Sequence, residues 1–288
     1  NSQLTTLYMY TNQIEYLPDC MLKNMGNLVT LNIRQNKIKY IWNNSCIPIG
    51  SKLRTIDGYD NQIEYLPDCF LSNMGELYTL NFRNNKIRYI WNQSCIPETN
   101  KLEILNLHQN LIECIPENFL KNMSKLRTLS LNNNKLKCVP YFTGLPAQNN
   151  LQNLNLEYNN LMYINASFFM NMFKLKAVNL HYNDLVACPG LEGLPVGVYT
   201  RTLNLNNNKI ATVHELFLRD KTRTQTLNMN NNPHMTYLPN YSGLTSPNVL
   251  QNLHIRFSGL RALTSTFFIN MTSLRYLYLS DNNIKTIP

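Results

Sequence analysis

Hydrophobic and polar positions alternate along this chain in a pattern that repeats every 24 or 25 residues. The pattern is L-x-x-L-x-L-x-x-N-x-L-x-x-L, and its twelve copies begin at residues 4, 28, 53, 77, 102, 126, 151, 175, 200, 224, 250 and 274. A fixed period in this range is typical of a solenoid, in which every repeat forms one turn and stacks on the turn before it.

The repetition is strongest near the N-terminus, where a two-turn stretch is nearly copied 49 residues later. Residues 12–48 read NQIEYLPDCMLKNMGNLVTLNIRQNKIKYIWNNSCIP, and residues 61–97 read NQIEYLPDCFLSNMGELYTLNFRNNKIRYIWNQSCIP. Because the repeat continues through the whole chain, we expect residues 1–288 to form one elongated domain rather than two globular ones.

The start of each turn predicts a short strand, because apolar residues alternate there, as in Leu129-Ser130-Leu131. Stacked strands would form a parallel sheet on the concave side. Odd-numbered turns continue with an apolar pair and a Met, such as Phe70, Leu71 and Met74, which predicts short helical turns on the convex side. Even-numbered turns carry prolines instead, which predicts extended convex segments.

The position after each predicted strand is Asn in eleven of the twelve turns, and Ser258 takes it in the other. An inward-facing Asn can hydrogen-bond backbone groups that the sheet leaves unsatisfied, so we expect a structural role for this row. Its members are Asn12, Asn36, Asn61, Asn85, Asn110, Asn134, Asn159, Asn183, Asn208, Asn232 and Asn282.

On these motifs the chain resembles the leucine-rich repeat family over its whole length. The resemblance implies an α/β solenoid shaped as a horseshoe, which acts as a binding scaffold through its concave sheet. In the sequence pattern of its repeats, the chain is similar to extracellular members of the family, namely the ectodomains of Toll-like receptors and the small leucine-rich proteoglycans. The resemblance therefore implies a secreted or cell-surface protein that is not an enzyme and that binds protein or glycan partners, as in innate immunity.

Composition narrows the function further. The formal net charge is +9, but Lys and Arg are spread along the repeats, so we do not expect a nucleic-acid partner. No apolar run reaches about 18 residues, so we do not expect membrane insertion by this segment. His108, His181 and His254 lie three turns apart, roughly 14 Å at 4.8 Å per strand, and therefore cannot share a metal ion. No cofactor, metal or catalytic motif is expected.

The cysteines indicate disulfides. Cys114 and Cys138 occupy the same slot of successive turns, within the range that a disulfide spans. The preferred pairs among the four earlier cysteines are Cys20 with Cys46 and Cys69 with Cys95, although Cys46 with Cys69 is also possible. Cys188 takes an inward leucine slot and is expected to be a buried free thiol. The alternative is a cytosolic repeat protein with seven free thiols.

Six N-x-S/T sequons suggest N-linked glycans, and all lie outside the predicted strands. The candidate sites are Asn43, Asn92, Asn122, Asn165, Asn240 and Asn270.

The concave face is formed by the third, fifth and seventh residues of each turn. The third is mostly Thr and the fifth mostly Asn, a monotony that favours self-stabilisation over a tailored binding site. The seventh residue and its neighbour vary more, and they include the aromatic and Arg side chains that dominate recognition hot spots. The alternative is a merely solvated face. The candidate binding residues are Arg34, Tyr59, Arg83, His108, Glu157, Tyr158, His181, Tyr182 and Arg256.

Neither end has a recognisable cap, so we expect either that the chain continues beyond residues 1–288 or that copies stack end to end. The first possibility predicts an extracellular receptor, adhesion or matrix scaffold. The second predicts a self-assembling subunit of an extracellular fibre.

Overall fold

The computed structural model describes residues 2–42, 46–92, 95–141, 143–188, 201–214, 217, 224–238 and 249–287. Two compact units emerge, one from residues 1–136 and 142–151 and the other from residues 137–141 and 152–288. Each unit contains six strands of three residues, and every strand pairs in parallel with its neighbour in the chain.

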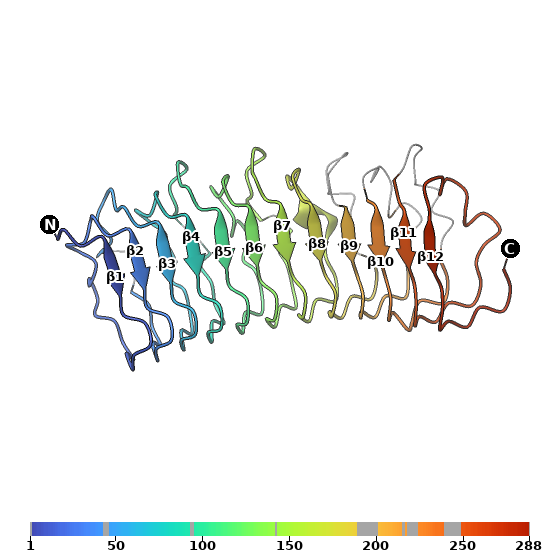
Figure 1. Ribbon diagram of the computed structural model, residues 1–288, viewed down its shortest axis with the longest axis horizontal. Helices are drawn as coiled ribbons and strands as arrows, with labels where there is room; N and C mark the ends of the chain where they lie inside the picture. Colours follow the sequence, from blue (N-terminus) through green and yellow to red (C-terminus); the bar gives the residue numbers. More distant parts are fainter. Residues whose placement is uncertain are drawn as a thin grey trace. The chain divides into compact units, whose positions relative to one another are not determined.

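Strands of the first unit stack side by side in chain order, as Figure 1 shows. They are β1 (Thr6–Tyr8), β2 (Thr30–Asn32), β3 (Thr55–Asp57), β4 (Thr79–Asn81), β5 (Ile104–Asn106) and β6 (Thr128–Ser130). The register pairs equal slots, so that Asn81 lies opposite Asn106 and Leu80 opposite Leu105. Side chains in the same slot of successive turns are therefore spatial neighbours, as the repeat predicts.

The second unit repeats this arrangement. Its strands are β7 (Asn153–Asn155), β8 (Ala177–Asn179), β9 (Thr202–Asn204), β10 (Thr226–Asn228), β11 (Asn252–His254) and β12 (Tyr276–Tyr278). In most strands of both units the middle residue is buried while the outer two are more exposed. The predicted solenoid with a parallel sheet is confirmed.

Helix is almost absent from the described residues. One of the predicted convex helical turns forms a helix, the 3-10 helix η2 (Ala166–Phe169), which is capped by Asn165. Other odd-numbered turns form single hydrogen-bonded turns, such as Phe70 N–H to Pro67 O at 3.2 Å. Positive φ angles at Cys69 (56°) and Asn73 (60°) bracket this segment, and residues in that region cannot belong to a right-handed helix.

Aromatic side chains fill the interior of the first unit. The ring of Trp91 stacks on Phe70 and on Phe119, with centroids 6.4 and 5.3 Å apart. Gly58 occupies an inward slot that other turns fill with a large apolar side chain, and the ring of Phe82 takes the space. A Cβ atom at Gly58 would lie 2.4 Å from that ring, so no larger residue fits unless Phe82 moves.

The asparagine row performs the structural role that the sequence predicts. The Nδ2 of Asn110 donates to the carbonyls of Leu107 in its own turn and of Phe82 in the preceding turn, at 3.0 and 2.9 Å. Its Oδ1 accepts the N–H of Ile87 at 3.0 Å. The row is buried from Asn36 to Asn232, and side chains such as those of Asn36 and Asn232 join a turn to the one before it. Ser258 makes a weaker contact, from its Oγ to Arg256 O at 3.4 Å.

Two disulfides connect adjacent turns within the first unit. Cys20 is bonded to Cys46 and Cys69 to Cys95, with Cα atoms 4.6 and 4.5 Å apart, as preferred from the slots. Cys114 and Cys138 are also disulfide-bonded. Cys188 is a free thiol, but it is partly exposed rather than fully buried. Desolvation raises the pKa of this thiol far above its usual range.

Candidate functional site

A row of residues with positive φ runs along the edge of the concave face, directly before the asparagine row. All twelve have φ between 52° and 58°, a region that Asn and Asp tolerate better than other side chains. We call this the left-handed row. Its members are Thr11, Gln35, Asp60, Asn84, Gln109, Asn133, Tyr158, Tyr182, Asn207, Asn231, Phe257 and Asp281.

Two consecutive members of the left-handed row are tyrosines whose rings form a platform. The rings of Tyr158 and Tyr182 stack with centroids 4.4 Å apart and planes 9° apart. Both side chains remain half exposed, at 44% and 45%. A bulky residue in the left-handed region costs about 1–2 kcal/mol, so each ring is held at a strained position.

A contact between a histidine and a carboxylate lies next to this platform. His181 Nε2 is 3.1 Å from Glu157 Oε2, and both side chains are only 17% exposed. The same carboxylate oxygen accepts a hydrogen bond of 2.6 Å from Asn179 Nδ2. The His181 ring meets Tyr158 and Tyr182 edge-on at 5.5 and 5.4 Å. These four residues, Glu157, Tyr158, His181 and Tyr182, form what we call the Tyr158 cluster.

Burial affects the chemistry of the Tyr158 cluster. Desolvation raises the pKa of Tyr158 above its ordinary value, and the neighbouring Tyr182 and Glu157 act in the same direction. The hydroxyl therefore stays protonated as a neutral hydrogen-bonding group at physiological pH. The cluster combines two apolar ring faces, phenol hydroxyls and one fixed carboxylate, which suits recognition by contact.

The candidates of the first unit lie in separate pairs instead. The guanidinium of Arg34 lies 4.8 Å from the ring centroid of Tyr10, and that of Arg83 lies 5.5 Å from Tyr59. Arg83 Nε also donates to Gln109 Oε1 at 3.2 Å. His108 is within 3.3 Å of the Asn132 side chain. Each arginine thus covers an aromatic ring of the preceding turn.

Arg256 belongs to another aromatic group, in the second unit. Its guanidinium lies 4.4 Å from the centroid of Tyr278, and the His254 ring stacks on the same tyrosine at 4.4 Å. Burial, and secondarily the charge of Arg256, lowers the pKa of His254. The sequence prediction omitted Tyr10, His254 and Tyr278. For Tyr10 the available signal was an aromatic residue and an arginine in the same slot of successive turns.

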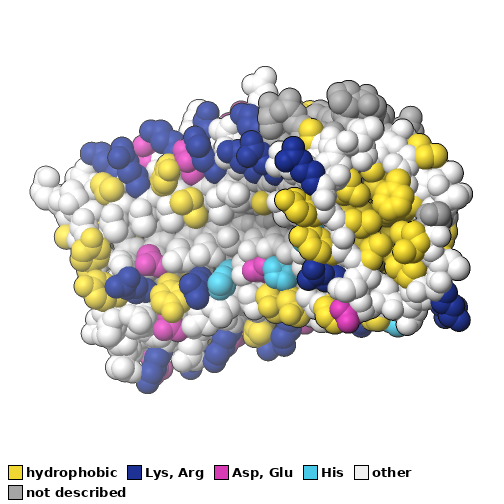
Figure 2. Space-filling model, turned by 45° about the vertical axis from the view of Figure 1, so that its right-hand side comes forward, with side chains coloured by type: hydrophobic (Ala, Val, Ile, Leu, Met, Phe, Trp, Pro, Cys, Tyr) yellow, Lys and Arg dark blue, Asp and Glu magenta, His cyan; other side chains and the backbone are white. Residues whose placement is uncertain are grey.

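The fifth-position asparagines stabilise the strand ends. For example, the N–H groups of His108 and Glu157 donate to Asn106 Oδ1 and Asn155 Oδ1, both at 3.2 Å. Figure 2 shows uncharged polar side chains around the charged, histidine and hydrophobic ones on one face. Among the residues that the structure describes, no group of three potential ligands could hold a metal ion. Likewise, no helix within the described ranges is long and apolar enough to span a membrane.

Comparisons with known proteins agree with this architecture. The family model described as "Leucine rich repeat" matches residues 100–147 and 248–288. No curated protein sequence matches the chain. A leucine-rich repeat protein of Leptospira interrogans is 21% identical, with a TM-score of 0.53, covering 99% of this chain and 86% of its own.

Two complexes provide further similar structures. The FLRT2 repeat domain, solved in an octameric complex with Latrophilin 3 and Unc5D, is 19% identical with a TM-score of 0.59, covering 96% of this chain and 75% of its own. Drosophila Toll bound to Spatzle is 18% identical with a TM-score of 0.68, covering 96% of this chain and 38% of its own. At these identities the likeness concerns the fold.

Proposed function

Because the chain is a leucine-rich repeat protein, we propose that it is an extracellular scaffold that binds a protein partner on its concave face. The Tyr158 cluster is the centre of that binding site. The scaffold performs no chemistry on the partner, as is general for proteins built on this repeat. The complexes of FLRT2 and Toll support a protein as the partner.

One observation carries this proposal, namely the position of the two stacked tyrosines. Eight of the twelve residues in the left-handed row are Asn, Asp or Gln, yet aromatic rings stand at 158, 182 and 257, and those at 158 and 182 stack on each other. Asn at these positions would relieve backbone strain, so folding alone does not favour tyrosine there. Strain of this kind tends to be retained where a side chain has a function, and half-exposed tyrosines are frequent binding hot spots.

The chemistry of the cluster suggests which part of a partner it accepts. The outer faces of the two stacked rings favour a flat apolar or cationic side chain. Glu157 beside them adds a negative charge that would orient a Lys or Arg of the partner. The formal net charge of +9 favours a partner that is acidic outside this contact, so association should slow at high salt.

The disulfides support the extracellular part of the proposal, because such bonds persist in oxidising compartments. The cytosolic alternative, with every thiol free, does not fit six bonded cysteines. Thiol counting on the unreduced protein tests this point. We expect one reactive thiol after unfolding, that of Cys188, and seven free thiols would contradict an extracellular location.

A photocrosslinking experiment tests the binding site. A photoreactive phenylalanine analogue replaces Tyr182 in one sample and Tyr89, on the flank, in a control sample. Each protein is exposed to the extracellular fraction of its source and irradiated, and crosslinked proteins are identified by mass. We expect a partner crosslinked at 182 and absent at 89. Equal labelling at both positions, or labelling only at 89, would refute the concave site.

The identified partner then allows a quantitative test with purified proteins. Tyr182→Ala should weaken binding at least about thirtyfold, the effect of losing a hot spot worth about 2 kcal/mol. Asn207→Ala in the same row is the matched control and should leave affinity within about threefold, because most interface positions contribute little. Sedimentation of the protein alone addresses the fibre alternative, which requires large assemblies without a partner.

A further inference from the structure

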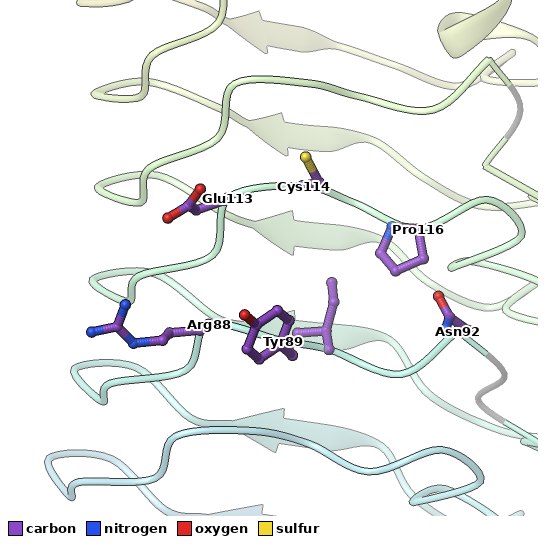
Figure 3. A pocket seen from close by; sticks show the side chains of 7 residues that line it. Arg88, Tyr89, Asn92, Glu113, Cys114 and Pro116 are labelled. Carbon is purple, nitrogen blue, oxygen red and sulfur yellow. The ribbon is translucent and has the colours of Figure 1, made fainter.

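Two cavities open on the flank of the solenoid, away from the concave face. The first, of about 530 Å³, is lined by residues of two successive turns that include Arg88, Tyr89, Asn92 and Pro116. Figure 3 shows Arg88, Tyr89 and Asn92 along one turn, opposite Glu113, Cys114 and Pro116 of the neighbouring turn. The second, of about 480 Å³, has Tyr141, Tyr163 and Asn165 in its wall.

The two cavities share a composition. The first contains one well-exposed tyrosine, Tyr89 at 73%, and the second contains two, Tyr141 at 67% and Tyr163 at 65%. Each also contains a sequon asparagine, Asn92 in the first and Asn165 in the second. Exposed aromatic rings beside an acceptor asparagine provide an apolar wall at the point where a sugar chain would begin.

The side chain of Asn165 is oriented for attachment of a sugar. Its Oδ1 accepts the N–H of Ser167 at 2.8 Å and caps η2, while Asn165 itself is exposed. Because the amide oxygen is turned back to the chain, the amide nitrogen, which carries the sugar, is on the opposite side and accessible.

Asn122 also lies in a sequon, but its amide nitrogen, rather than its amide oxygen, is engaged by the backbone. Its Nδ2 donates to Ile96 O of the preceding turn at 3.2 Å, and the residue is partly buried with φ of 67°. Asn270 has the same backbone geometry, with φ of 68°, and is also partly buried. These two asparagines belong to the fold. Asn43 and Asn240 lie outside the described residues.

We propose that Asn165 and Asn92 carry N-linked oligosaccharides whose first sugar rings lie in these flank cavities, against Tyr163 and Tyr141 in one and Tyr89 in the other. This inference rests on the extracellular part of the proposed function. The apolar C–H face of a sugar ring packs on the phenol rings, and Arg88 and Lys137 at the cavity walls provide donors for its oxygens.

The attachment is a group transfer from a lipid-linked oligosaccharide diphosphate. The asparagine Nδ2 bonds to C1 of the first sugar and loses one proton. The bond between C1 and the phosphate oxygen breaks, and the lipid diphosphate leaves with the electron pair. No electron transfer is involved, and this chain contributes only the acceptor sequon and the surface that covers the product.

Glycopeptide mass analysis of protein secreted from eukaryotic cells tests the sites. We expect sugar on Asn165 and Asn92 and none on Asn122 or Asn270. Asn165→Asp keeps the capping oxygen and Ser167→Ala keeps the asparagine, so both should fold normally and lose only the sugar at 165. Secreted protein without sugar, or with Asn122 occupied as fully as Asn165, would overturn the inference. Failure of secretion would instead contradict the proposed extracellular location.

Enzymatic deglycosylation of the native protein tests the cavities. Packing on tyrosine should protect the sugar linkage, and Tyr163→Ala should speed its removal from Asn165 by up to about tenfold, the equivalent of about 1.4 kcal/mol of lost contact. Removal from Asn92 in the same molecule is the internal control and should not change, whereas Tyr89→Ala should have the reverse selectivity. Unchanged rates in both variants would show that the tyrosines do not contact the sugar.

Discussion

The concave faces of the two units use the same residue types in different ways. In the first unit, Tyr10 with Arg34 and Tyr59 with Arg83 repeat one cation–π pair at an interval of two turns, so each ring has a cationic partner within the scaffold, although Tyr10 is still 42% exposed. In the second unit, Tyr158 and Tyr182 stack on each other from strained positions and stay half exposed beside the largely buried contact of His181 with Glu157. Contacts copied with the repeat stabilise the scaffold, whereas the Tyr158 cluster departs from the repeat and is the part of the molecule that we propose for recognition.

Among the changes that test this comparison, loss of a disulfide should alter stability the most. Replacing Cys69 and Cys95 together by Ser opens a link between residues 26 apart in the first unit, and should lower the free energy of unfolding by about 2–4 kcal/mol. Thermal unfolding measures the loss. Because the Tyr158 cluster lies in the other unit, partner affinity below the melting temperature should not change, and a loss of affinity would contradict the separation of roles.

The asparagine row should contribute equally to the free energy of unfolding in both units. Asn110→Leu and Asn183→Leu each remove three carbonyl contacts and leave the N–H of Ile87 or Leu161 without its side-chain acceptor. Each should cost about 2–3 kcal/mol in chemical denaturation, because an unsatisfied buried polar group costs that much. A markedly smaller cost at Asn183 would mean that the scaffolds themselves differ, which would undermine the comparison.

The cation–π pairs should affect stability modestly and binding hardly at all. Arg83→Ala should lower the free energy of unfolding by about 0.5–1 kcal/mol, the value of an exposed cation–π contact. Denaturant titration gives this number, and Arg83→Lys should recover part of it. A partner affinity reduced tenfold or more by Arg83→Ala would place the first unit within the binding site.

A small pH effect is expected from His254. Because its folded pKa is lowered from 6.5, the unfolded chain binds the proton more readily, and stability present above that pH is lost as the pH falls below it. The melting temperature should therefore fall slightly more between pH 8 and 5 in the natural protein than in His254→Gln. Equal slopes would show that His254 is not desolvated in the fold.

The sequence predicted the scaffold because each structural position is repeated. The strands and the Asn110-type contacts follow from knowing that equal slots are neighbours, and the preferred pairing of Cys20 with Cys46 follows from nearby slots of adjacent turns. The predicted helical turns were met by a helix only at η2 among the described residues, because the positive φ of residues such as Cys69 depends on backbone geometry that the pattern does not encode.

The binding candidates were harder to predict. Residue type alone selected both Arg83 and Tyr158, although Arg83 forms a cation–π pair that the repeat copies, whereas Tyr158 stacks on Tyr182 from a strained backbone position. Their difference depends on how rings and guanidinium groups of neighbouring turns meet, which is a matter of side-chain packing. Tyr278 was missed for the same reason, since its role follows from contact with His254 and Arg256.

The central claim is that Tyr158 and Tyr182 are retained for binding at a cost to folding, and the double variant Tyr158→Asn/Tyr182→Asn tests it most directly. Asn relieves about 1 kcal/mol of strain at each position, which offsets the loss of a ring stack worth about 0.5–1.5 kcal/mol. The free energy of unfolding should therefore stay equal or rise, while partner affinity falls at least about thirtyfold. A variant that is clearly less stable, or that binds as before, would contradict the account.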